Sequence, residues 1–246
     1  MFKLMLVRHG QTELNKHGIM QGQIDEPLND TGRSQAMDLA CFLKDEVYTH
    51  VFSSDLARAS ETCKLALSKN TSFQDAKSDI QIKLEPRLRE RCYGSMEGKP
   101  FVEYLNAAKE AGIDRKSFTP EGAETRIQLL KRAEDFFMSL CESVYLNMSN
   151  GDENVTCKAN VLAVGHGAYW RSLCELLRDT FGCIFNQSLQ PVMANAGRTS
   201  LIVTLPSRKT ADDVIFDTSE TNSLDDWKNG ITIKCLSLNI PVHSNL

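Results

Sequence analysis

The sequence lacks the features that mark membrane proteins, nucleic-acid-binding proteins and disulfide-rich secreted proteins. Its 28 Lys and Arg residues nearly balance its 32 Asp and Glu residues, so the net charge of −4 gives no bulk attraction to nucleic acid or an anionic membrane. No apolar run approaches the ~20 residues that span a bilayer, and the apolar start is too short for a signal peptide. We therefore expect a cytoplasmic protein, with neither nucleic acid nor an integral membrane contact among its partners.

Paired cysteines and interdomain linkers are also missing. The eight cysteines are spread singly from Cys41 to Cys235, without a C-x-x-C pair or the spacing of zinc ligands, and without an export signal we expect reduced thiols. Gly, Pro and Ser are scattered, and the only strongly polar stretch, at about residues 147–160, lies between apolar periodic segments. We predict a single domain over residues 1–246, with this stretch as a surface loop.

What the chain does contain is an alternation of short apolar runs and amphipathic helices. The runs typical of strands covered on both faces are residues 4–7, 51–53, 161–165 and 201–205. Helical spacing is found at 36–43, after Asp55 as a candidate cap, from Ile127 to Val144 and at 168–179, whereas residues 231–238 alternate like an edge strand. This order predicts the α/β class, as a three-layer α/β/α sandwich with a mostly parallel central sheet.

The first apolar run ends on Arg8-His9-Gly10, within ten residues of the start. An imidazole nitrogen can attack a phosphoryl group, and the planar guanidinium of arginine matches phosphate oxygens. This combination of residue types indicates phosphoryl chemistry if the rest of the chain completes the site.

The same order of apolar strand, His, Gly and helix returns at Gly165-His166-Gly167. Because the carboxyl ends of parallel strands face one crevice, His9 and His166 are predicted to be neighbours, each followed by a helix start that offers N–H groups to an anion. A single histidine after a strand is more often structural. Two in the same order, one of them next to Arg8, favour catalysis.

Two further charged segments have competing interpretations. Arg58 falls in the first turn of a helix, where the dipole disfavours a cation, and taken alone it suggests a solvated surface arginine. Glu90 lies among three arginines, and taken alone it suggests an ordinary charge-mixed loop. A phosphate contact for Arg58 becomes preferable because His9 and His166 are predicted at the same sheet edge.

Together these segments resemble the histidine phosphatase superfamily, in the branch shared by cofactor-dependent phosphoglycerate mutases and fructose-2,6-bisphosphatases. The likeness is greatest to stand-alone fructose-2,6-bisphosphatase-like regulators of glycolysis, although Gly165 stands where such proteins often have Ser and Ala123 replaces a Gly. The ordered motifs that carry the resemblance are Arg8-His9-Gly10-Gln11-Thr12 with Asn15, Gln21-Gly22-Gln23, Ser53 to Ala59 with Thr62, Arg87 to Gly94, Phe118 to Thr125, and Gly165-His166-Gly167.

The resemblance implies a phosphohistidine mechanism that uses neither a metal nor a cofactor. It makes His9 the nucleophile and Glu90 the acid that protonates the leaving oxygen and then deprotonates water. It places Arg8, Arg58 and His166 around the oxygens of the transferred phosphate. The substrate-binding residues carried over with it are Asn15, Gln21, Gly22, Gln23, Tyr93 and Gly167.

The segment between Gly94 and Glu121 distinguishes hydrolysis from transfer. Its 26 residues are too few for the water-excluding insertion of the mutases, which favours a phosphatase. We expect a small phosphorylated metabolite as substrate, first of all fructose 2,6-bisphosphate, with 2,3-bisphosphoglycerate and phosphoglycerate mutase activity as alternatives and a non-catalytic scaffold as a remoter one. The candidate cations for a second phosphate are Lys99, Arg115, Lys116 and Arg126, among which the sequence does not choose.

Overall fold

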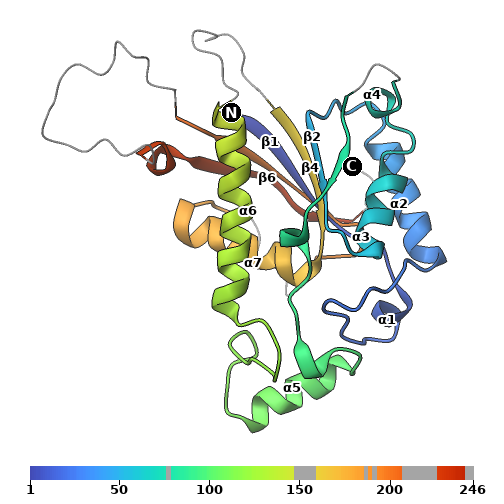
Figure 1. The fold of residues 1–246 in the computed structure, drawn as a ribbon, viewed down its shortest axis with the longest axis vertical. Coiled ribbons are helices and arrows are strands. Elements are labelled where there is room, and N and C mark those ends of the chain that lie inside the picture. The colour runs from blue at the N-terminus through green and yellow to red at the C-terminus, as the bar shows by residue number, and fades with distance from the viewer. Residues whose placement is uncertain (76–78, 147–158, 186–187, 190–192, 207–225, 242–246) are drawn as a thin grey trace, which may run out of the picture.

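A sheet with helices on both faces organises the chain (Figure 1). The computed structural model describes residues 1–75, 79–146, 159–185, 188–189, 193–206 and 226–241. The strands in these ranges are β1 (Phe2–Arg8), β2 (His50–Ser53), β3 (Ile82–Leu84), β4 (Ala159–Gly165), β5 (Arg198–Thr204) and β6 (Thr232–Ile240). Their order is β3-β2-β4-β1-β5-β6, in which β3, β2, β4 and β1 pair in parallel and β5 is antiparallel to both of its neighbours. The mostly parallel sheet and the edge position of β6 are confirmed.

The side chains of β1 alternate between two cores, as the period of two in a strand requires. Phe2, Leu4 and Leu6 pack with α6 (Arg126–Leu146) and α7 (Gly167–Phe181) on one face. Met5 and Val7 pack with α2 (Asp30–Phe42) and α3 (Ala57–Ala66) on the other. Because one strand supplies apolar side chains to both faces, the sheet is covered twice, and the predicted three-layer sandwich is confirmed.

The remaining helices are short, and two of them lie beyond the carboxyl ends of the parallel strands. The remaining α-helices are α1 (Glu13–Lys16), α4 (Thr71–Gln74) and α5 (Phe101–Glu110), and 3-10 helices cover Pro86–Leu88, Gly94–Met96 and Asp226–Gly230. In Figure 1, α1 and α5 lie at the lower end of the molecule, past the ends of β1 and β4. Among the described helices, none has the length and apolar character needed to cross a bilayer.

The inward face of α6 follows the predicted apolar spacing at Phe137, Leu140 and Val144, which are buried, but departs from it at the start of the helix. Ile127 is 80% exposed, whereas Leu129 and Phe136 are buried. Two positions along a helix correspond to a rotation of about 200°, so Ile127 and Leu129 lie on opposite faces, and packing against the sheet selects the face with Leu129. Residues 147–158 of the predicted polar loop lie outside the described residues.

The start of α3 also departs from expectation. Asp55 does not cap this helix, because its carboxylate receives two bonds from the Arg89 guanidinium, at 2.8 and 2.6 Å. The carboxylate of Asp25 instead accepts the backbone N–H of Ala57 at 2.6 Å. A residue from a distant loop therefore takes the role that the local sequence assigned to Asp55.

Gly165, the last residue of β4, is packed against the indole of Trp170. A Cβ at position 165 would lie 2.8 Å from Cζ2 of Trp170 and 3.3 Å from the backbone oxygen of Leu88. Trp170 is fully buried, and its Nε1–H donates to the carbonyl of Val7 at 2.8 Å. The indole cannot move aside without losing this bond, which explains why glycine stands here.

We expect Gly165→Ala to lower the free energy of unfolding by about 1–3 kcal/mol, the usual cost of overpacking a core. Urea denaturation followed by circular dichroism measures the change. In a Trp170→Met background, whose flexible side chain can yield, the same substitution should cost less by about 1 kcal/mol. An equal cost in both backgrounds would contradict the clash with Trp170.

Candidate active site

β1 and β4 place two histidines side by side. The strands pair in parallel with Arg8 opposite Gly165, and the backbone N–H of His9 donates to the carbonyl of Gly165 at 2.9 Å. The residues that follow the two strands, His9 and His166, are buried, with ring centroids 5.1 Å apart. The predicted contact between the two histidines is confirmed.

The His9 ring is oriented by its own turn. Nδ1 lies 2.7 Å from the carbonyl oxygen of Gly10, which can only accept, so Nδ1 carries the hydrogen and Nε2 carries a lone pair. Burial, and then the positive charges of Arg58 and Arg8, hold the pKa of His9 well below its ordinary value of 6.5. The imidazole is therefore neutral at pH 7, the state in which its nitrogen can act as a nucleophile.

Two arginines flank this histidine, of which Arg58 is buried and Arg8 is partly buried. Arg58 donates to the carbonyls of Ile24 at 2.6 Å and Gly22 at 2.7 Å, and Arg8 donates to that of Met193 at 2.6 Å. Within the described ranges, Nε of each arginine is buried without a hydrogen-bond partner. Burial lowers the pKa of Arg8 to about 10, which leaves it charged at pH 7. Arg58 is only 1% exposed, so the interpretation as a solvated surface residue is wrong.

The first turn of α7 holds the carboxylate of Glu90. Its Oε2 accepts the N–H of Ala168 at 3.0 Å, and its Oε1 accepts those of Tyr169 at 2.9 Å and Arg91 at 2.8 Å. A carboxylate is stabilised at a helix N-terminus by the dipole and the unpaired amides. The prediction that these amides are offered to a bound anion is thus wrong. The amides that follow β1 are likewise bonded to side chains of the protein.

A cavity of about 350 Å³ opens beside His9. The predicted site residues that line it are Arg8, His9, Asn15, Gln21, Gly22, Arg58, Glu90 and Tyr93. Three others do not: His166 is buried beside His9, Gly167 begins α7, and Gln23 donates through Nε2 to the carbonyl of Glu90 at 3.2 Å. The lining residues that sequence analysis missed are Gly18, Ile19, Met20, Phe101, Ala168 and Asn195.

Asn195 orients a neighbouring amide in this cavity. Its Nδ2 donates to the carbonyl of His9 and to Oδ1 of Asn15, both at 3.2 Å. Because the Asn15 oxygen also faces the N–H of Thr12 at 3.4 Å, the NH₂ group is the end of Asn15 left to donate to a ligand. No motif marks Asn195, which reaches the site because β5 lies antiparallel beside β1.

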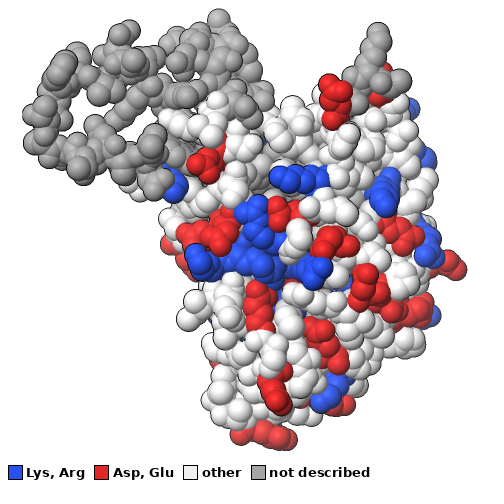
Figure 2. All heavy atoms as spheres, viewed as in Figure 1, with Lys and Arg blue, Asp and Glu red and all other residues white. Residues whose placement is uncertain are grey.

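A second cavity, of about 150 Å³, adjoins the first and shares Tyr93, Phe101 and Ala168 with it. The cations that line it are Arg91, Arg115, Lys116, Arg126 and Arg171. Figure 2 shows Lys and Arg side chains gathered at the centre of one face, with acidic side chains around them. Of the cations proposed for a second phosphate, Arg115, Lys116 and Arg126 line this cavity, whereas Lys99 does not.

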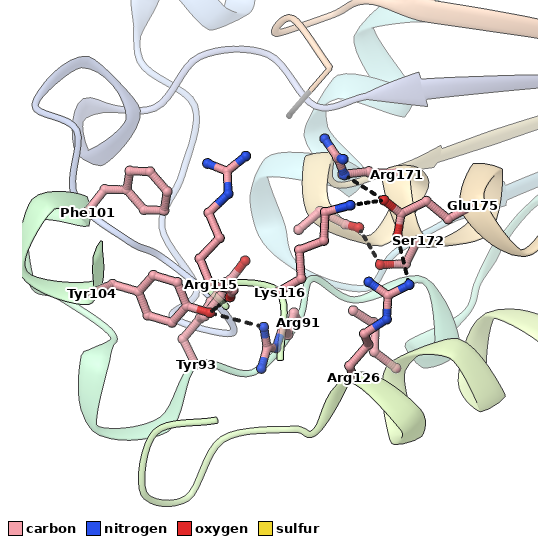
Figure 3. A pocket seen from close by; sticks show the side chains of 12 residues that line it. Arg91, Tyr93, Phe101, Tyr104, Arg115, Lys116, Arg126, Arg171, Ser172 and Glu175 are labelled. Carbon is pink, nitrogen blue, oxygen red and sulfur yellow. Dashed lines mark hydrogen bonds and ion pairs between the residues drawn. The ribbon is translucent and has the colours of Figure 1, made fainter. Parts of the chain in front are cut away.

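One buried carboxylate anchors three of these cations. Glu175 in α7 accepts from Lys116 at 3.1 Å, Arg126 at 3.2 Å and Arg171 at 3.1 Å. Burial alone would raise the pKa of Glu175, but the hydrogen bond from Lys116 and the charges of the two arginines outweigh it and lower the pKa. Figure 3 shows these side chains converging on Glu175, while the Arg115 guanidinium extends into the cavity. The cluster keeps a net positive charge, and sequence analysis did not predict that Glu175 holds it together.

These observations define the class of the protein. Residues 4–204 match the family model of the histidine phosphatase superfamily, branch 1. The chain belongs to this superfamily, and it is a phosphatase of this class.

Two named relatives are similar in sequence to most of this chain. The fructose-2,6-bisphosphatase TIGAR of Bos taurus is 37% identical over 243 residues, covering 82% of this chain and 88% of the relative. The fructose-2,6-bisphosphatase TIGAR of Xenopus tropicalis is 38% identical over 245 residues, covering 84% and 88%.

Solved structures share the fold. A mycobacterial glucosyl-3-phosphoglycerate phosphatase in complex with VO3 superposes with a TM-score of 0.68 at 23% identity, covering 98% of this chain and 100% of its own. A phosphoglycerate mutase from Bacillus anthracis superposes with a TM-score of 0.66 at 25% identity, covering 81% and 87%. At 23% identity, the likeness to the mycobacterial phosphatase shows a shared fold and nothing more.

The depressed pKa of His9 predicts a pH dependence of stability. In the unfolded chain His9 titrates near pH 6.5, but in the folded protein it stays neutral below that pH, so the unfolded state binds the extra proton. This residue's contribution is fully present above pH 6.5 and is lost as the pH falls. His9→Gln should therefore make the fall in unfolding free energy below pH 6.5 shallower by about 1.4 kcal/mol per pH unit.

Urea denaturation between pH 5 and 7.5 measures these slopes. His17→Gln is the matched control, because the His17 side chain is 64% exposed and it should retain the wild-type slope. Identical slopes for the His9 and His17 variants would contradict the neutral state of His9.

Proposed function

We propose that the protein hydrolyses a small bisphosphorylated metabolite, fructose 2,6-bisphosphate, through a phosphohistidine on His9 and without a metal ion. The observation that carries this proposal is the junction of two cavities. One is lined by a neutral histidine and two arginines, and the other is lined by cations. A substrate with one phosphate in each cavity matches both.

In the first step, Nε2 of His9 attacks the phosphorus, and a P–N bond forms as the bond to the leaving oxygen breaks. Arg8 and Arg58 offset the charge on the non-bridging oxygens through charge-assisted hydrogen bonds. Their unpartnered Nε groups supply donors for this purpose. Asn15, which lines the cavity, and His166, whose ring lies beside that of His9, are proposed as donors that carry no charge.

Glu90 serves both halves of the reaction. It enters the reaction as the carboxylic acid, with the proton on Oε2, which accepts only one amide bond. It gives this proton to the leaving oxygen, and as the carboxylate it then takes a proton from the water that attacks the phosphohistidine, breaks the P–N bond and releases inorganic phosphate, which restores the acid. The amides of Ala168 and Tyr169 fix this carboxylate on the cavity that His9 also lines. Because the segment after Gly94 folds back as the single helix α5, we infer that water keeps access to the site, which favours hydrolysis over transfer.

The distal phosphate is assigned to the second cavity. Lys116 and Arg126 are held there by Glu175, and Arg115 extends into the same space, so several donors converge where a phosphate would sit. The relatives named as fructose-2,6-bisphosphatases support this substrate over other esters. We infer lower glycolytic flux through phosphofructokinase as the output of the reaction.

His9→Ala removes the attacking nitrogen. Turnover of fructose 2,6-bisphosphate should fall by at least about 10⁴-fold, and the acid-labile phosphoprotein formed by the wild-type protein should disappear. Rapid-quench assays with labelled substrate measure both. His17→Ala is the control for loss of a histidine and should behave as the wild-type protein.

Turnover that survives in His9→Ala would contradict the phosphohistidine mechanism. The substrate is tested separately by kcat/KM for fructose 2,6-bisphosphate, 2,3-bisphosphoglycerate and 3-phosphoglycerate. A higher value for 2,3-bisphosphoglycerate, or conversion of 3-phosphoglycerate to its 2-isomer, would overturn the substrate and leave the nucleophile in place.

Arg115→Gln tests the second cavity. Removing one charge-assisted bond to the distal phosphate should raise KM for fructose 2,6-bisphosphate about tenfold or more, with little change in kcat. Hydrolysis of para-nitrophenyl phosphate, which has no distal phosphate, should not change. Lys109→Gln removes an exposed charge at the end of α5, outside both cavities, and is the matched control. Equal effects on the two substrates would contradict the assignment.

A further inference from the structure

Ser54 contacts the second histidine of the site, and sequence analysis assigned it no role. This serine follows β2 directly and precedes α3, the helix that carries Arg58. Its side chain is buried, and its Oγ lies 2.9 Å from Nε2 of His166. The backbone N–H of Ser54 donates to the carbonyl of Val164 at 2.9 Å, which fixes the serine against the strand that ends just before His166.

The neighbours of Ser54 limit what its hydroxyl can do. The N–H of Leu56 points at Oγ from 3.4 Å, so an acceptor position of the oxygen already faces a donor. The hydroxyl hydrogen is free to turn towards Nε2 of His166, which then accepts through its lone pair. In a neutral imidazole, the hydrogen must consequently reside on Nδ1.

The other nitrogen of His166 is consistent with this arrangement. Nδ1 is buried and has no hydrogen-bond partner in the described part of the chain. The ring is neutral, because burial and the positive charges of Arg58, Arg8 and Arg132 lower its pKa well below 6.5. A phosphate oxygen can accept a hydrogen bond from an N–H group at Nδ1, but it would repel a lone pair there.

We propose that Ser54 is a positioning residue that sets the tautomer of His166, holding the hydrogen on Nδ1 so that a neutral imidazole donates to the transferred phosphate. This inference rests on the proposed role of His166 at the phosphate. The two histidines then carry their hydrogens for different purposes. The Gly10 carbonyl keeps Nε2 of His9 bare for attack, whereas Ser54 keeps Nδ1 of His166 protonated for donation.

The tautomer is read directly in the free protein by ¹⁵N NMR of the histidine rings at pH 7.5, with His166→Asn used to assign the signals. Wild-type His166 should carry its hydrogen on Nδ1. In Ser54→Ala, the hydrogen should shift wholly or partly to Nε2, which is the favoured site in free neutral histidine. Wild-type protein with the hydrogen on Nε2, or an unchanged tautomer in Ser54→Ala, would overturn the proposal.

Kinetics supply the second readout. Ser54→Ala should lower kcat and the rate of phosphohistidine formation by about tenfold or more, approaching the roughly 100-fold loss caused by removing an oxyanion donor. Ser53→Ala is the matched control, because this neighbouring buried hydroxyl donates to the Ser54 carbonyl at 2.9 Å, whereas the hydrogen bond that the described residues make to Nε2 of His166 comes from Ser54. Equal losses in the two variants would show a merely structural role and overturn the proposal.

The NMR measurement separates this inference from the proposed function. If no phosphate ester is hydrolysed by the wild-type protein, the proposed function fails, while the tautomer of His166 in the free protein is still measured. If hydrolysis proceeds but the tautomer does not depend on Ser54, only the present inference fails.

Discussion

The parallel pairing of β1 with β4 is the constraint on which the site depends. These two strands lie at the centre of the sheet, and their register sets Arg8 opposite Gly165. The residues that follow, His9 and His166, leave the sheet at the same edge with their rings in contact. A shift of the register by one residue would turn every side chain of a strand to the opposite face and separate the two rings. The apolar side chains that β1 sends to both cores prevent such a shift.

Burial gives this pair of histidines its chemical character. Water would screen two arginines close to a solvated imidazole, but in the buried site their charges are screened much less. The result is a neutral ring beside fixed positive charge, a combination that receives a phosphate dianion without first losing a proton. Backbone carbonyls accept from both arginines, and within the described part of the chain no ion pair neutralises their charge.

The two joined cavities treat charge in different ways. In the cavity beside His9, the Nε groups of Arg8 and Arg58 have no hydrogen-bond partner among the described residues. The Glu90 carboxylate that lines this cavity is bonded to the first turn of α7. In the neighbouring cavity, Glu175 gathers cations from the segment after α5, from α6 and from α7 itself. A buried carboxylate among several cations preorganises them at the expense of some positive potential. This division supports chemistry in one cavity and recognition in the other.

The strand-helix alternation, the two His-Gly segments and the family motifs were readable from the sequence because each is a local pattern. Hydrophobic period and motif order sufficed for the sandwich, the edge strand and the contact of His9 with His166. Three predictions were wrong because a distant partner decides each feature. Arg89 binds the Asp55 carboxylate that was expected to cap α3, and packing against the sheet leaves Ile127 of α6 exposed. Glu90 occupies the amides at the start of α7 that were expected to bind an anion. Asn195 and Glu175 have no local signature, and Ser54, although it lies in a family motif, carries no mark of its contact with His166. The sequence by itself determined the class of chemistry, through residue types at strand ends. Only the tertiary structure decided which groups hold, neutralise or orient them, because hydrogen bonds and burial between segments far apart in the chain follow from packing.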